Sequence, residues 1–185
     1  MKGKMQDQFL VAAALSGDEE AFGKLYDKYV DDIFRFVSFR VRNQAEAEDL
    51  SADVFLKAWQ YLTGGSKGIE NFKALLYRIA RNVVIDHYRK SGRELLSIDE
   101  SQWETLVDTS LNIEEHQQIK DDLRLVREAI EELLPDHREL ILMRYADDLT
   151  IEEISCISGK SKGAVRVTLH RAVKALKEVI KKRFG

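Results

Sequence analysis

Apolar residues recur along most of the chain at intervals of three and four positions, the spacing that places them on one face of an α-helix. Segments with the two-residue period of a β-strand are hard to find. In the first half, the pattern predicts four helices with apolar faces over Phe9–Ala14, Phe22–Val41, Leu50–Leu62 and Phe72–Val84. We therefore expect an all-α chain in which these four helices surround one core.

A second group of apolar faces predicts another small helical domain later in the chain. Its members are Ile119–Leu133, Leu140–Tyr145, Ile151–Ile157 and Val165–Ile180. The only proline, Pro135, suits the first turn of a helix because it has no N–H to donate. Other helix starts are marked by polar residues that can cap them, and these are Asn43 with Glu46, Asn71, Asn112 with Glu115, Thr150 with Glu153, and Ser161.

The last two of these helices have the pattern of a helix-turn-helix. A short helix is followed by a three-residue turn that contains Gly159, and a longer basic helix begins after Ser161. In this motif the second helix enters the DNA major groove and reads bases with residues near its amino-terminal end. The outward positions of that helix are Lys162, Arg166, Val167, His170, Arg171 and Lys174.

Charge is divided unevenly along the chain, although the total is only −3. Residues 71–93 hold six basic residues against one acidic residue, and residues 160–185 hold nine against one. Two basic segments indicate binding of a polyanion at two places, although helix faces that merely meet solvent give the same count. Between them, residues 94–115 hold seven acidic residues, no Lys or Arg and little periodicity, which predicts a flexible acidic linker. The expected organisation is a domain at 1–92, a linker at 93–111 and a second domain at 112–185.

The sequence offers little for an enzyme, a metal site or a membrane span. No histidine has a glutamate three residues before it, as a di-iron bundle requires, and the glycines at 64–68 lack the spacing of a phosphate-binding loop. No apolar run approaches the roughly 18 residues of a membrane helix. The single cysteine, Cys156, excludes an internal disulfide and a multi-cysteine zinc site. We therefore expect a cytoplasmic, non-enzymatic protein without a cofactor or a metal.

Four stretches, in order, resemble the extracytoplasmic-function (ECF) sigma factors, the specificity subunits of bacterial RNA polymerase. They are Ala21–Tyr29, Ala47–Trp59, Phe72–Arg89, and Leu133–Tyr145 followed by the helix-turn-helix. The resemblance covers both expected domains, and the order of the stretches is more specific than any single motif. It implies a subunit that binds core RNA polymerase, directs it to promoter DNA and assists promoter melting. An anti-sigma factor is a further partner that the resemblance allows.

The resemblance also implies roles for individual residues. In the family, the helix that carries the Glu-Asp-Leu motif docks on a coiled coil of the polymerase clamp, which here corresponds to Glu48, Asp49, Leu50, Asp53 and Trp59. Trp59 has a second interpretation as a core residue. The next helix and the loop before it open the minus-ten element, which implies Lys67, Asn82, Asp86, Tyr88, Arg89 and Lys90, with Tyr88 as a surface for an extruded base. The last helix reads the minus-thirty-five element, which implies Lys162, Arg166, Val167, Thr168, His170, Arg171 and Lys174.

Three positions depart from the family pattern. Ala52 stands where Gln is common, Leu75 stands where Trp is common, and Val167-Thr168 replaces the usual Ser-Arg. The last departure predicts an altered base preference. Two other functions stay open at this point: a helix-turn-helix regulator that binds duplex DNA without polymerase, and a helical protein–protein adaptor whose basic faces are incidental.

Overall fold

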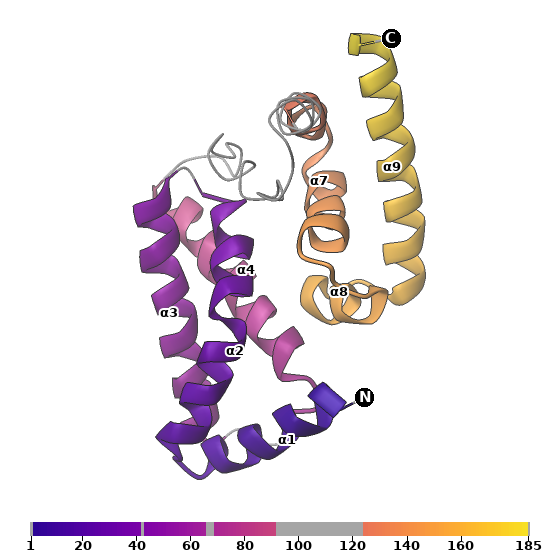
Figure 1. The fold of residues 1–185 in the computed structure, drawn as a ribbon. Coiled ribbons are helices and arrows are strands. Elements are labelled where there is room, and N and C mark those ends of the chain that lie inside the picture. Colours follow the sequence, from indigo (N-terminus) through magenta and orange to yellow (C-terminus); the bar gives the residue numbers. More distant parts are fainter. Residues whose placement is uncertain (1, 42, 66–68, 92–123, 185) are drawn as a thin grey trace, which may run out of the picture. The chain divides into compact units, whose positions relative to one another are not determined.

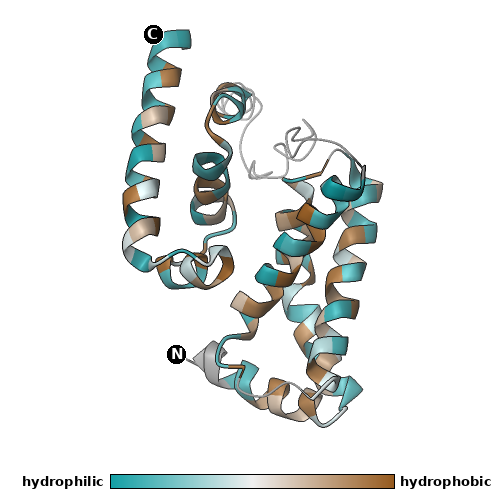
Figure 2. Ribbon diagram, turned by 180° about the vertical axis from the view of Figure 1, so that it is seen from behind, coloured by the Kyte–Doolittle hydropathy of each residue, from teal (hydrophilic) through white to brown (hydrophobic). Residues whose placement is uncertain are grey.

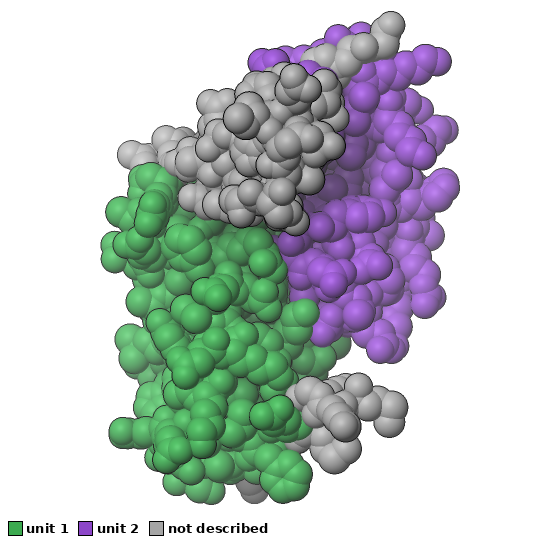
Figure 3. Space-filling model, in the orientation of Figure 1, with its two compact units in different colours: residues 1–95, 156–158 green, residues 96–155, 159–185 purple. Residues whose placement is uncertain are grey.

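The structure, a computed structural model, describes the chain except for residues 1, 42, 66–68, 92–123 and 185. The chain divides into two compact units, residues 1–95 with 156–158 and residues 96–155 with 159–185 (Figure 3). All regular elements of the described residues are helical (Figure 1), which confirms the predicted fold class. The predicted linker at 93–111 lies outside the described residues, so the three domain boundaries stay predictions.

Four helices build the first unit. They are α1 (Lys2–Leu15), α2 (Glu19–Ser38), α3 (Gln44–Thr63) and α4 (Phe72–Ser91). The last three pack against one another, and α1 packs mainly on α2. Fully buried side chains from all three packed helices meet in one core, and the ring of Tyr77 lies edge-on to Phe36 at a centroid distance of 5.1 Å.

Side-chain caps start three of these helices where the sequence favours them. The carboxylate of Asp18 accepts a hydrogen bond from the Ala21 amide at 3.0 Å, at the start of α2. Asn43 accepts one from the Glu46 amide at 2.9 Å, and Asn71 accepts one from the Ala74 amide at 3.0 Å. Each cap satisfies one of the amides that have no partner inside the helix, so helix starts can be located from single polar residues.

The first helix differs from its prediction. Phe9 is 75% exposed, whereas Asp7, Val11 and Ala14 are buried. These three residues are spaced by four and three positions, so they share one face, and Phe9 lies on the opposite face. Asp7 is stabilised there because its carboxylate accepts hydrogen bonds from Lys28 and, at 2.5 Å, from the Tyr29 hydroxyl. Figure 2 shows how apolar and polar residues alternate along the helices.

The second unit contains a helical stretch at residues 124–131, followed by α7 (Pro135–Ile141), a π-helical turn η1 (Leu142–Ala146), α8 (Ile151–Ser158) and α9 (Lys162–Phe184). We describe α8 with this unit because it is the first helix of the helix-turn-helix. Pro135 occupies the first turn of α7, as predicted. Helices α7 and α9 pack against each other. The buried side chains include Leu140 and Ile141 of α7 and Val165, Leu169 and Ala172 of α9.

Arg138 joins α7 to the end of the helical stretch before it. Its guanidinium donates hydrogen bonds to the carbonyl oxygens of Ile130 at 3.2 Å, Leu133 at 3.4 Å and Glu131. Burial lowers the pKa of this guanidinium, an effect that the nearby Glu131 carboxylate opposes. A cation at carbonyls that end a helix is favourable, so Arg138 has a structural role.

Candidate nucleic-acid and polymerase interfaces

Helix α3 has an outward face that carries two acidic residues and, one turn further along, an apolar one. Asp49 and Leu56 are exposed and Asp53 is half-exposed, while Ala47, Val54 and Ala58 are buried on the opposite side. The spacing of four and three positions between Asp49, Asp53 and Leu56 puts them on one line along the helix. Leu56 is 54% exposed and was not among the residues expected from the sequence. The sequence feature that could have identified Leu56 is its spacing from the two aspartates, which places it on the same helix face.

The other three residues expected at this interface border the face. Glu48 is exposed and accepts a hydrogen bond from the Gln44 side-chain amide at 2.7 Å. Leu50 and Trp59 are half-buried, and the Trp59 ring packs on Phe22 at a centroid distance of 5.0 Å. Trp59 therefore contributes to the packing of α2 on α3 and keeps only part of its ring available for a partner.

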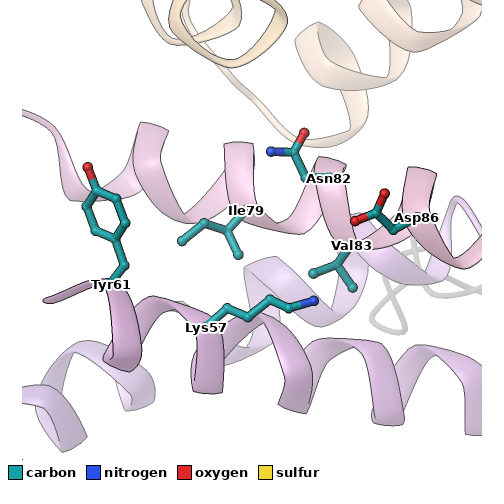
Figure 4. A pocket seen from close by; sticks show the side chains of 6 residues that line it. All are labelled: Lys57, Tyr61, Ile79, Asn82, Val83 and Asp86. Carbon is teal, nitrogen blue, oxygen red and sulfur yellow. The ribbon is translucent and has the colours of Figure 1, made fainter. Parts of the chain in front are cut away.

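A cavity of about 230 Å³ opens between α3 and α4. Its walls are formed by Lys57 and Tyr61 of α3 and by Ile79, Asn82, Val83 and Asp86 of α4 (Figure 4). Two residues expected at the minus-ten element, Asn82 and Asp86, thus lie in one cavity. Apolar walls with an amide, a carboxylate and an exposed aromatic ring are suited to a flat, polar-edged ligand such as a nucleobase.

Charge at this cavity is balanced by two ion pairs. The Asp86 carboxylate lies 3.1 Å from the Arg89 guanidinium, and Lys57 donates to the Asp53 carboxylate at 2.7 Å. Arg89 and Lys90 are exposed in the last turn of α4. The pairing with Arg89 offsets the repulsion that Asp86 would exert on DNA phosphates.

Tyr88 does not fit the role expected of it. It is 3% exposed, and its ring packs edge-on to His87 at a centroid distance of 5.4 Å. A ring buried in the core cannot stack on a base, so Tyr88 leaves the candidate site. Tyr61, which is 41% exposed in the cavity wall, is the aromatic residue in its place. Lys67, expected in the same site, lies outside the described residues.

The helix-turn-helix of the second unit has the start and stop signals that the sequence predicts. Thr150 and Glu153 form a reciprocal capping box at the start of α8. Gly159 ends the helix with φ of 73°, a left-handed conformation that glycine adopts without strain. The Ser161 hydroxyl then accepts a hydrogen bond from the Ala164 amide at 3.2 Å and starts α9. These caps fix the turn between the two helices.

The residues expected at the minus-thirty-five element differ in how available they are. Arg166, Val167, His170, Arg171 and Lys174 are exposed, and Thr168 is half-buried. Lys162 is exposed as well, but its ammonium is paired with the Glu152 carboxylate of α8. Lys174 lies 4.0 Å from Glu178, and no ion pair involves Arg166 or Arg171 within the part of the chain that the structure describes.

Within the described ranges, no group of three or more His, Cys, Asp or Glu side chains could hold a metal ion. None of the described helices combines the length and apolarity that a membrane crossing requires.

Known proteins match the two units in the same order. The family model for sigma-70 region 2 matches residues 25–94, and the model for sigma-70 region 4 matches residues 123–176. The ECF RNA polymerase sigma factor SigW of Bacillus subtilis is 30% identical over 89% of this chain and 91% of its own length. The chain belongs to the ECF sigma factors.

A second sigma factor relative is longer than this chain. The ECF RNA polymerase sigma factor BldN of Streptomyces coelicolor is 31% identical over 92% of this chain, and the match spans 64% of BldN. Among solved structures, that of CnrH in complex with the cytosolic domain of CnrY has a similar fold, with a TM-score of 0.70 at 22% identity over 96% of this chain and 99% of CnrH.

The two family matches contain the candidate sites of this sigma factor. The region 2 match includes the outward face of α3 and the cavity between α3 and α4. The region 4 match includes α8 and α9 as far as residue 176, and so contains all the residues expected at the minus-thirty-five element.

Proposed function

We propose that this chain binds core RNA polymerase, directs it to promoters with two separate DNA elements and helps to melt one of them. The observation that carries the proposal is that one chain holds both a cavity suited to a nucleobase and a helix-turn-helix with exposed arginines. A regulator of duplex DNA needs only the second of these features. The proposed boundaries of the two functional parts are residues 1–92 and 112–185.

The outward face of α3 is the proposed polymerase-binding surface. Asp49 and Asp53 supply negative charge for basic partner residues, and Leu56 supplies an exposed apolar side chain one turn beyond Asp53. Protein interfaces usually combine apolar contacts with polar and charged groups at their edge. Glu48, Leu50 and Trp59 would form its border.

The cavity between α3 and α4 is the proposed site for an extruded base of the minus-ten element. Asn82 and Asp86 supply hydrogen-bonding groups, Tyr61 supplies an aromatic surface, and Arg89 and Lys90 supply positive charge for the strand. Extrusion of a base from the duplex costs a few kcal/mol, and contacts of this kind offset that cost. Lys67 stays a predicted member of the site.

Helix α9 is the proposed reader of the minus-thirty-five element. Arg166 and Arg171 are exposed, and an arginine can make two hydrogen bonds to a guanine edge in the major groove. Lys174, one turn further along, is placed for a phosphate contact. Lys162 would have to leave Glu152 before it could bind DNA.

The proposed subunit has no catalytic chemistry of its own, because phosphodiester bond formation belongs to the polymerase. It would act in the cytoplasm, where core polymerase and promoter DNA are found. The structure of CnrH was solved with the cytosolic domain of CnrY bound. We infer that this chain, too, has a protein regulator, which the family resemblance describes as an anti-sigma factor.

Transcription with purified core polymerase tests the function. We expect the full chain to co-elute with core polymerase and to yield promoter-dependent transcripts. The double variant Asp49→Lys/Asp53→Lys should lose co-elution, whereas Lys177→Ala, an exposed position on α9, should retain it. Tight binding to duplex DNA without polymerase would favour a stand-alone regulator, and absence of binding to both would favour an adaptor.

A further inference from the structure

Val167 is an exposed apolar side chain in the part of α9 that a helix-turn-helix presents to DNA. It is 51% exposed and lies in the first two turns of the helix. Val165 and Leu169, two residues to either side, are buried in the core of the second unit. These neighbours anchor the helix, so Val167 is not needed for its packing.

On the side of Val167 that faces the start of the helix, the neighbouring residues have small side chains or none. Gly163, one turn earlier, has no side chain, and a Cβ built there would meet nothing closer than the Ser161 hydroxyl at 4.0 Å. Ala164, beside it, is exposed and small. Long side chains on this face resume only one turn later, at His170 and Arg171. The amino-terminal end of a recognition helix contacts the base edges. Because Gly163 and Ala164 have no long side chains, the Val167 methyl groups can approach those edges.

The chemistry of valine restricts what it can recognise in the major groove. Its side chain neither donates nor accepts a hydrogen bond, and a polar base edge held against it would lose water without a replacement partner. Thymine is the one base of ordinary DNA that presents an apolar group there, its 5-methyl. A β-branched side chain in a helix also has one strongly preferred rotamer, so little rotational freedom is lost on contact.

We propose that Val167 determines specificity by packing on a thymine methyl group in the upstream promoter element. The chain thereby selects T at one position of that element, next to the bases that Arg166 and Arg171 contact. This inference rests on the proposed function, since it takes α9 to be the reader of promoter DNA.

The first test is selection of the upstream element from a randomised promoter library by the holoenzyme. Wild-type holoenzyme should select T, on one strand, at one position. Val167→Ala should lose that preference and keep the others, because the substitution removes both methyl groups and favours the helix. Val179→Ala, which truncates a half-buried valine near the end of the same helix, is the matched control and should select the wild-type sequence.

The second test removes only the methyl group from the DNA. Uracil in place of the selected thymine should weaken wild-type promoter binding by about threefold to fivefold, the effect of one buried methyl-sized group. The same replacement of thymine by uracil should not alter promoter binding by the Val167→Ala variant. Selection without a preferred T, or an equal effect of uracil on both proteins, overturns the inference while promoter-dependent transcription persists. Loss of that transcription in the wild type overturns the proposed function, and the inference with it.

Discussion

Tyr61 and Tyr88 show how burial decides which aromatic ring can meet a DNA base. The family resemblance predicts Tyr88 as a surface for a base, and Tyr88 precedes Arg89 and Lys90 in a basic segment. It follows Val84 by four positions, so it continues the buried stripe of α4, and its ring lies in the core. Tyr61 lies on the flank of α3, and only the packing of α3 against α4 brings it to Asn82 and Asp86. Sequence periodicity can exclude the first residue, but it cannot find the second.

We expect Tyr61→Ala to lower the formation of open promoter complexes by about fivefold to a hundredfold. Stacking of a base on an aromatic side chain contributes roughly 1–3 kcal/mol, and this variant removes the ring from the cavity. Permanganate reactivity of thymines around the minus-ten element measures the opening directly. Co-elution with core polymerase should be unchanged, because Tyr61 lies away from the outward face of α3.

Tyr26→Ala is the matched control for this change. Tyr26 is also 41% exposed, and its ring packs on Phe55 at a centroid distance of 4.6 Å, away from the cavity. The control should open promoters at the wild-type level once stability is taken into account. Equal opening by Tyr61→Ala and the wild type would remove the ring from the site.

The positions at which helices begin and end are the structural features that the sequence predicts best. The caps at Asn43, Asn71 and Ser161, the capping box at Thr150 and the left-handed Gly159 all lie at the predicted positions, since each depends on local hydrogen bonds. The π-helical turn η1 was not predicted. In this turn the Asp147 amide donates a hydrogen bond to the Leu142 carbonyl at 3.0 Å, five residues earlier instead of four. The turn therefore holds one more residue than an α-helical turn.

This turn explains why one part of the predicted apolar face is wrong. The three- and four-residue spacing placed Tyr145 with Leu140 and Ile141 in the core. Tyr145 is instead 67% exposed, while Leu142 and Met143 are buried. A change of helical period depends on packing of the whole unit, so single-residue preferences do not reveal it.

Arg138 connects two helical elements, and we expect Arg138→Ala to destabilise the second unit by about 1–3 kcal/mol. The variant leaves the carbonyls of Ile130, Glu131 and Leu133 without the cation that now donates to them. Hydrogen exchange of the α7 amides measures the free energy of opening in the full chain. Arg138→Lys should recover part of the loss, because it restores the charge without the branched donor geometry.

The comparison for this change is Arg124→Ala in the helical stretch that Arg138 contacts. Arg124 is 55% exposed in its side chain and lies 4.0 Å from Glu128, a pairing that contributes little in water. Its replacement should change the free energy of opening by less than about 0.5 kcal/mol. Similar losses in both variants would mean that Arg138 acts only through general surface charge.

At the scale of the whole molecule, the total charge of −3 says little, because it is a balance of opposite segments. The sequence predicts which helices are basic and that two separate units carry them. It does not predict which cations are available, because that depends on acidic neighbours in space. Lys162 is paired with Glu152, and Arg183 lies 2.7 Å from Glu132 and 3.3 Å from Glu128. Part of the basic character of α9 therefore stabilises the second unit.

The difference between paired and available cations on α9 predicts how promoter binding by the holoenzyme depends on salt. Each cation that neutralises a phosphate releases counterions, so removing one lowers the slope of log affinity against log salt by about 0.9. We expect that reduction for Lys174→Ala, uniformly across promoter sequences, because Lys174 is exposed and its nearest acidic partner, Glu178, lies 4.0 Å away. Salt titration of promoter binding measures the slope.

Arg183→Ala should leave that slope unchanged, although it removes the same charge from the same helix. Its guanidinium is held by two glutamates, so the expected effect is a faster exchange of the amides near residues 128–132. A slope that falls equally in both variants would show that total charge, and not the position of each cation, governs binding. A slope that falls only in Lys174→Ala would show that Lys174 neutralises a phosphate and that Arg183 does not.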